Sequence, residues 1–217
     1  MATATNISRR ASETGVWRWM VAAAVAAMVV GAAAMGLHGA GRAGSESAVY
    51  FTGRLAFLFF WPSYAGSALA TLFGPWFQPV KRHARAFGLG FASVIAVHLC
   101  LVGRLYWIGD APPFETLAIF GVAAAWVAAL AAASTPRVAR AIGPPGWWVL
   151  NNLGMNYIAG AFALDFLRIP HPLTLHRAVE DLPFAALAVL GPLLRLSAWL
   201  ASFAVSAKSA AISPRKG

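Results

Sequence analysis

Long apolar runs alternate with short polar segments along the chain, and this alternation predicts a bundle of membrane-spanning helices. Each run is near the ~20 residues that an α-helix needs to cross the hydrocarbon core of a bilayer. Segments rich in proline and glycine fall between the runs, where they end helices at little cost. We therefore expect an all-α integral membrane protein with six transmembrane helices, over residues 17–39, 51–73, 87–108, 114–133, 147–167 and 183–205.

The composition agrees with a membrane protein and excludes a soluble globular domain. Of the 217 residues, 59% are hydrophobic and only 11% are charged, and the mean hydropathy is +0.66, far above that of a soluble domain. We expect a tail over residues 1–16, a transmembrane domain over 17–207 and a second tail over 208–217. The first run could instead be a secretory signal, but it is longer than the ~7 to 15 apolar residues of such signals.

The charged residues are divided unequally between the two sides of this bundle. The net charge is +10, yet the basic residues form no continuous stripe, so we expect no nucleic-acid partner. Eleven of the 17 basic residues fall on one side: ten in the tails and in the second and fourth connections, and Arg18 at the start of the first run. Five of the seven acidic residues fall on the other side. Because basic residues concentrate on the cytoplasmic side, both termini are expected there, in a multi-pass protein of the inner (cytoplasmic) membrane.

A single histidine, His98, lies in the middle of the third apolar run. An ionisable side chain at membrane depth is costly, so it is a candidate functional residue. A histidine between helices can hold haem iron as an axial ligand. The alternative is that His98 only forms a hydrogen bond to a neighbouring helix, as many buried polar residues do.

The residues around His98 resemble a known family. The segment RHARAFGLG at residues 82–90, followed by His98, is similar to the start of the first histidine helix in the ferric reductase-like transmembrane domain superfamily. GRLA at 53–56, STP at 134–136 and WWVL at 147–150 extend the resemblance over about residues 50–168. The layout is most similar to the haem-binding membrane subunits of bacterial methionine sulfoxide reductase systems. The resemblance implies a subunit that passes electrons through haem from a cytoplasmic donor or quinol to an acceptor outside.

The fifth run departs from the family pattern at both positions where the family carries histidine. The first of these positions holds Asn151, and the second holds Asp165, or Leu164 if the alignment is shifted by one residue. Met155 and His38 are candidate replacements, because the rise per residue places each within one or two helical turns of His98 in depth, and methionine accompanies histidine in some haem proteins. Arg82 and Arg85 are candidates for contact with haem propionates or with an electron donor. The candidates for cofactor binding are therefore His98, Met155, His38, Arg82, Arg85 and Asn151, with His98 also the candidate metal ligand.

Two functions follow from these residues. The first is a membrane electron-transfer subunit with one b-type haem at His98 and a partner protein that supplies or accepts electrons; a quinone or flavin is neither indicated nor excluded. The second is a haem-free member of the family that serves as a structural or assembly subunit. Transport past Asn156, Arg195 and Asp165 has no inverted repeat in its favour. Because no nucleophile with a base, acid pair or nucleotide motif is visible, the chain is at most the redox subunit of an oxidoreductase.

Overall fold

The computed structural model places the chain almost entirely in α-helices. It describes residues 2–168 and 175–212, and the side chains of residues 15–168 and 179–204. The described part contains no strand. His171, a loop histidine of the sequence, lies outside the described residues, as does the side chain of His176. The helices of the described part are α1 (Ala2–His38), α2 (Arg42–Phe73), the short 3₁₀ helix η1 (Gly74–Phe77), α3 (Gln78–Trp107), α4 (Phe114–Ala133), α5 (Pro136–Leu167) and α6 (Leu175–Ile212).

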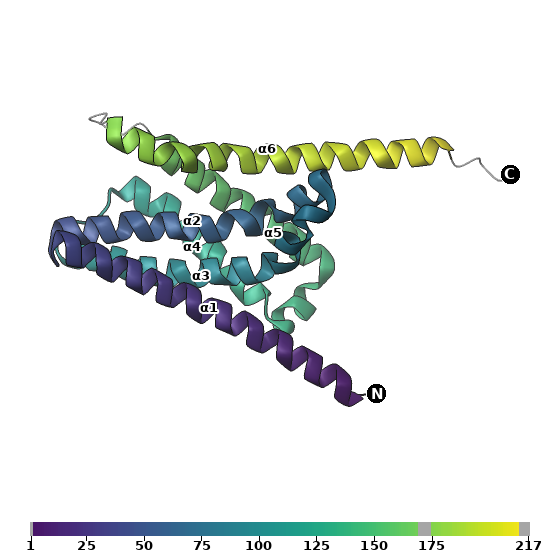
Figure 1. The fold of residues 1–217 in the computed structure, drawn as a ribbon, viewed down its shortest axis with the longest axis horizontal. Helices are drawn as coiled ribbons and strands as arrows, with labels where there is room; N and C mark the ends of the chain where they lie inside the picture. Colours follow the sequence, from purple (N-terminus) through teal and green to yellow (C-terminus); the bar gives the residue numbers. More distant parts are fainter. Residues whose placement is uncertain (1, 169–174, 213–217) are drawn as a thin grey trace.

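Consecutive helices run in opposite directions, so the chain passes up and down through one bundle (Figure 1). Helix α2 is central, because it packs against α1, α3 and α6, while α4 packs mainly against α5. The first residues of α1 and the last residues of α6 lie at the same end of the bundle, beyond which both helices extend (Figure 1). We call this the terminal end, and we call the other end, where α1 turns into α2 and α3 into α4, the opposite end.

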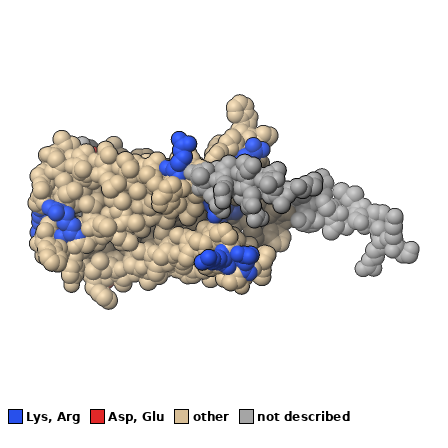
Figure 2. Space-filling model, turned by 90° about the horizontal axis from the view of Figure 1, so that it is seen from below, with Lys and Arg blue, Asp and Glu red and all other residues tan. Residues whose placement is uncertain are grey.

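The protein is an all-helical membrane protein. Four helical stretches of the described part are long and apolar enough to cross a membrane, and the second of them contains α2, η1 and α3 in succession. Helix α5 is not among the four, because Asn151, Asn152 and Asn156 make its apolar half more polar than theirs. The face seen in Figure 2 is largely uncharged, with basic side chains in a few separated spots, which is compatible with contact to lipid. The four stretches are Gly15–His38, Arg42–Trp107, Phe114–Ala133 and Val179–Ala204.

The helices extend beyond the apolar runs that predict them. Only α4 has the expected bounds at both ends, and most of the expected tail over residues 1–16 belongs to α1. The segment 143–146, expected to separate two helices, interrupts α5 at one residue: Gly143 has φ 64° and ψ 178°. Pro144 and Pro145 then stand in the first turn of the renewed helix, where a missing N–H leaves no hydrogen bond unmade. The sequence predicts a separate connection here, but the structure makes the bend at a single residue, Gly143.

Aromatic rings fill the core between α2, α3 and α5. The ring of Phe57 lies 5.1 Å from that of Phe162 and 4.9 Å from that of Phe166, centroid to centroid. Phe60 lies 5.3 Å from Phe91 on α3. Edge and offset contacts of this kind contribute about 0.5 to 1.5 kcal/mol each beyond the burial of area. These rings fix the distance between α2 and α5, and therefore the space that remains beside them.

Candidate functional site

Two cavities lie between α2, α3, α4 and α5, one toward each end of the bundle. The terminal-end cavity has a volume of about 540 Å³ and the opposite-end cavity about 420 Å³. Phe91 of α3 and Val127 of α4 line both of them, so these two side chains are part of the wall between the cavities. Apolar cavities of this size with a few polar side chains are typical ligand sites.

His98 lines the opposite-end cavity, and Thr52 of α2 holds its ring in place. The Thr52 hydroxyl oxygen lies 2.7 Å from the carbonyl oxygen of Ala48, to which it donates its proton. It also lies 2.9 Å from Nδ1 of His98. Because the hydroxyl proton is engaged by Ala48, this geometry favours the tautomer in which His98 donates Nδ1–H to the Thr52 oxygen. In that tautomer Nε2 is the unprotonated nitrogen, and it makes no hydrogen bond to any described residue.

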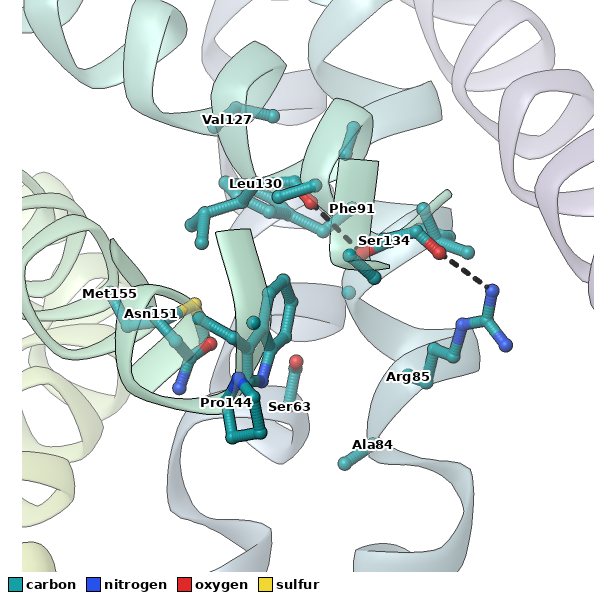
Figure 3. A pocket seen from close by; sticks show the side chains of 17 residues that line it. Ser63, Ala84, Arg85, Phe91, Val127, Leu130, Ser134, Pro144, Asn151 and Met155 are labelled. Atoms are coloured by element: carbon teal, nitrogen blue, oxygen red, sulfur yellow. Dashed lines mark hydrogen bonds between the residues drawn. The ribbon is translucent and has the colours of Figure 1, made fainter. Parts of the chain in front are cut away.

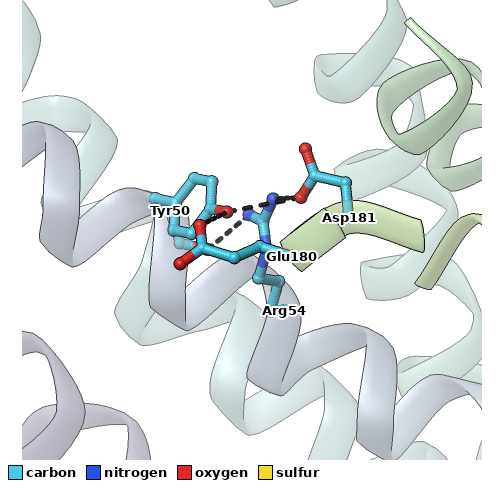
Figure 4. A network of polar contacts seen from close by, with 4 residues as sticks. All are labelled: Tyr50, Arg54, Glu180 and Asp181. Carbon is cyan, nitrogen blue, oxygen red and sulfur yellow. Dashed lines mark hydrogen bonds and ion pairs between the residues drawn. The ribbon is translucent and has the colours of Figure 1, made fainter. Parts of the chain in front are cut away.

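A polar network borders the same cavity and joins α2 to α6 (Figure 4). Arg54 forms an ion pair with Asp181 and donates a hydrogen bond to the Tyr50 carbonyl oxygen at 3.1 Å. Its guanidinium carbon lies 3.2 Å from the centroid of the Tyr50 ring. The Tyr50 hydroxyl donates to Glu180 at 3.1 Å. Arg54 Nε is buried without a partner among the described residues, so this side of the cavity retains an unused donor.

The terminal-end cavity has one basic side chain, Arg85, at its side (Figure 3). Arg85 donates a hydrogen bond to the Ser134 carbonyl oxygen at 3.0 Å. Ser63 and Asn151 also line this cavity, and neither side chain is hydrogen-bonded to another described residue. A ligand that offered oxygen atoms could accept hydrogen bonds from both.

The structure divides the predicted cofactor residues among three places. His98 lines the opposite-end cavity, whereas Met155, Arg85 and Asn151 line the terminal-end cavity. His38 and Arg82 are exposed and line neither cavity, and His38 Nδ1 lies 3.0 Å from the carbonyl oxygen of Ala34 in its own helix. His98 and Met155 are therefore not brought to one cavity.

The residues of the opposite-end cavity fit a haem with one axial histidine. Among its lining side chains, His98 is the one nitrogen or sulfur donor of the kind that binds haem iron. Arg54 lines the same cavity and is paired with Asp181, but its unpartnered Nε could donate to a propionate; the acidic side chains of Glu46 and Asp165 also line this cavity. The described residues contain no cluster of three or more His, Cys, Asp or Glu side chains that could hold a bare metal ion. The donor set thus suits a cofactor that brings its own equatorial ligands.

Three residues of this site, Thr52, Tyr50 and Arg54, were not assigned a role by the sequence. A threonine in an apolar run is an ordinary residue, and its partner, His98, is 46 positions away. The signal that could have drawn attention to Arg54 is its position just inside a predicted span, where charged residues are rare and usually paired. Comparisons with protein-family models, with curated proteins and with solved structures found no match to this chain.

Proposed function

We propose that this chain is a membrane electron-transfer subunit of the ferric reductase-like type, which binds one b-type haem in the opposite-end cavity. The observation that supports this proposal is the orientation of His98: its Nδ1–H is donated to Thr52, which leaves Nε2 free at a cavity wall. Histidines that bind metals usually donate their other N–H in this way. When bound, haem iron supplies one-electron redox chemistry.

The side chains around His98 would support this role in three ways. The hydrogen bond to Thr52 holds the ring in one tautomer and increases the basicity of Nε2. Phe162 and Ile158 of α5, together with α4, provide apolar walls that exclude water. Arg54 carries a positive charge at the edge of the cavity and has one unused donor, Nε.

The proposed topology has six helices crossing the inner membrane, with both termini in the cytoplasm. Helix α5 would complete the set of six, because it runs the length of the bundle beside α4 (Figure 1). The terminal end carries the basic residues Lys81, Arg82 and Arg85, and basic residues favour the cytoplasmic side. The terminal-end cavity would then lie on the side of a cytoplasmic or quinol electron donor. A partner subunit would supply or accept the electrons.

The experiment that tests haem binding is the optical spectrum of the purified protein, oxidised and then reduced with dithionite. We expect a sharp reduced α-band that is absent from His98→Ala. His38→Ala and Met155→Leu are the matched controls, and both should retain the band because neither residue lines the opposite-end cavity. A band that survived in His98→Ala would contradict the assignment of this ligand.

The second candidate function is a haem-free structural or assembly subunit of a membrane complex. It is favoured by one observation: the side chains that α5 turns toward His98, such as Ile158, Ala161 and Phe162, offer no second axial donor. A colourless preparation that is folded and stable would support this alternative and exclude the first.

A further inference from the structure

Arg195 carries a charge within the membrane-spanning part of α6. It stands nine residues before the end of the apolar stretch Val179–Ala204, which corresponds to a depth of about 13 Å from that end and about 24 Å from the other. Its Nη2 donates to the Asn152 side-chain oxygen at 2.8 Å. Its guanidinium carbon lies 4.5 Å from the centroid of the Tyr64 ring. Arg195 is therefore held at this depth by groups from α5 and α2.

These contacts leave the positive charge of Arg195 without a counter-charge. The ion pairs of the described residues join Arg42 to Glu46 and Asp110, and Arg54 to Asp181. Asn152 and Tyr64 are neutral groups, so they orient the guanidinium but do not neutralise it. An arginine near the centre of a transmembrane helix costs about 2.5 to 3.5 kcal/mol on insertion scales, and such residues generally pair.

Further polar groups surround Arg195 and reach the surface of the bundle. The Tyr64 hydroxyl donates to the Asn156 side-chain oxygen at 2.7 Å, which leaves the Asn156 amide N–H groups without a partner among the described residues. Asn156 is exposed and Arg195 is partly exposed, and neither lines one of the two cavities. We call Tyr64, Asn152, Asn156 and Arg195 the Arg195 cluster. It presents a positive charge and amide donors on a surface that faces lipid.

The depth of the cluster argues against a lipid phosphate as the counter-ion. Phosphates lie outside a hydrocarbon core that is about 30 Å thick, and α6 continues to Ile212, beyond the apolar stretch. Arg195 is bound to Asn152 and stacked on Tyr64 instead of extending along α6 toward the membrane surface. Gly191, one turn earlier, leaves room for the Tyr64 ring, since a Cβ there would lie 3.2 Å from it. The counter-charge must therefore come from another helix at the same depth.

We propose that the Arg195 cluster is the docking site for a transmembrane helix of a partner subunit, and that this helix carries an Asp or Glu side chain near the middle of the bilayer. A carboxylate would neutralise Arg195 and accept a hydrogen bond from the free amide of Asn156. Charge-assisted hydrogen bonds are stronger than neutral ones, and lipid provides no competing water. This docking site is independent of haem binding, because the cluster and the opposite-end cavity share no residue.

The test uses the full chain in neutral phosphatidylcholine vesicles and a synthetic transmembrane peptide as the probe. The peptide is a leucine- and alanine-rich helix of 24 residues with one central Glu, and its matched control has Gln at that position. Association is measured by energy transfer between fluorophores on the chain and the peptide. We expect roughly tenfold tighter association of the Glu peptide, equivalent to about 1.4 kcal/mol. Equal association of the two peptides would overturn the proposal without requiring any variant of the chain.

Variants then assign the preference to Arg195. Arg195→Gln should abolish the difference between the two peptides, whereas Arg195→Lys, which keeps the charge, should retain part of it. Arg104→Gln, a basic residue at the opposite end, is the matched control and should keep the full preference. A preference that survived in Arg195→Gln would overturn the assignment. Loss of the preference when anionic phosphatidylglycerol replaces part of the neutral lipid would identify lipid as the counter-ion and would also overturn it.

Discussion

The Thr52 hydroxyl oxygen lies 2.9 Å from Nδ1 of His98, and this hydrogen bond joins α2 to α3 beside the opposite-end cavity. Its direction is determined by a second hydrogen bond, from the same hydroxyl to the Ala48 carbonyl oxygen. The position of one proton on α2 therefore decides which nitrogen of a histidine on α3 is free to bind a ligand.

Replacing Thr52 by valine tests this relationship. Thr52→Val keeps the shape of the side chain but removes the acceptor, so the His98 ring loses its fixed tautomer. Loss of an outer hydrogen-bond partner typically weakens metal affinity about 10- to 100-fold, so we expect lower haem content at a given haem concentration, measured from the reduced α-band. Thr71→Val is the control, because the Thr71 hydroxyl bonds only to the Ser67 carbonyl oxygen of its own helix. Equal haem content in the two variants would contradict the proposed role of Thr52.

Filling the opposite-end cavity should exclude haem without touching His98. Ala124→Phe places a ring in that cavity, and we expect it to abolish the α-band while the protein stays folded. Ala139→Phe makes the same change in the terminal-end cavity. Because Ala139 does not line the opposite-end cavity, this variant should retain its haem. The proposed location of the haem would be wrong if Ala139→Phe lost the band and Ala124→Phe kept it.

The ion pair between Arg54 and Asp181 should stabilise the contact between α2 and α6. The side chains of Arg54 and Asp181 are only 13% and 22% exposed, so Asp181→Asn leaves a buried positive charge without its partner. We expect a loss of about 3 kcal/mol in the free energy of unfolding, measured by denaturation in detergent. Arg42→Gln is the control, since the Arg42 side chain is 71% exposed and its ion pairs should contribute at most about 1 kcal/mol. Similar losses in both variants would show that burial does not matter here.

Two glycines of α5 should respond differently to the same substitution. A Cβ at Gly154 would lie 2.9 Å from the Trp126 ring and 3.1 Å from a Leu130 methyl group, whereas nothing lies within 4 Å of one at Gly160. We expect Gly154→Val to destabilise the packing of α4 against α5 by about 1 to 3 kcal/mol. Gly160→Val should change the thermal midpoint little. A larger shift for Gly160→Val would mean that α4 and α5 are packed in another way.

The ends of a helix could be predicted from the sequence where an apolar run is bordered by a proline. The bounds of α4 follow from Pro113 at one side and from Ser134, Thr135 and Pro136 at the other. The part of α5 before Trp147 could not be predicted in this way. In a sequence, a proline in the first turn of a helix cannot be distinguished from a proline that follows the end of a helix. Only the backbone angle of Gly143 distinguishes these two cases.

The sequence could predict how deep each candidate residue lies in the membrane, but not which cavity its side chain faces. The rise per residue brings Met155 to nearly the depth of His98, yet the side chain of Met155 lines the other cavity. Depth depends on position along one helix, whereas direction depends on how that helix is rotated against its neighbours. The same limit applies to Tyr50 and Glu180, whose contact joins residues 130 positions apart. Asp165 and Arg168 are three positions apart on the sequence but form no ion pair in the described part of the chain; Arg168 lies 3.5 Å from the Thr116 hydroxyl oxygen.

The side chains of Phe91 and Val127 separate the terminal-end cavity from the opposite-end cavity. A transporter would need one continuous passage instead. Water that enters from either end of the protein meets these apolar side chains near the middle of the membrane. Under the proposed function, an electron would have to cross this apolar wall, where neither Phe91 nor Val127 offers a polar group to a hydrated proton. In the proposed electron-transfer subunit, such a wall would let electrons pass without a continuous path for water between the two cavities.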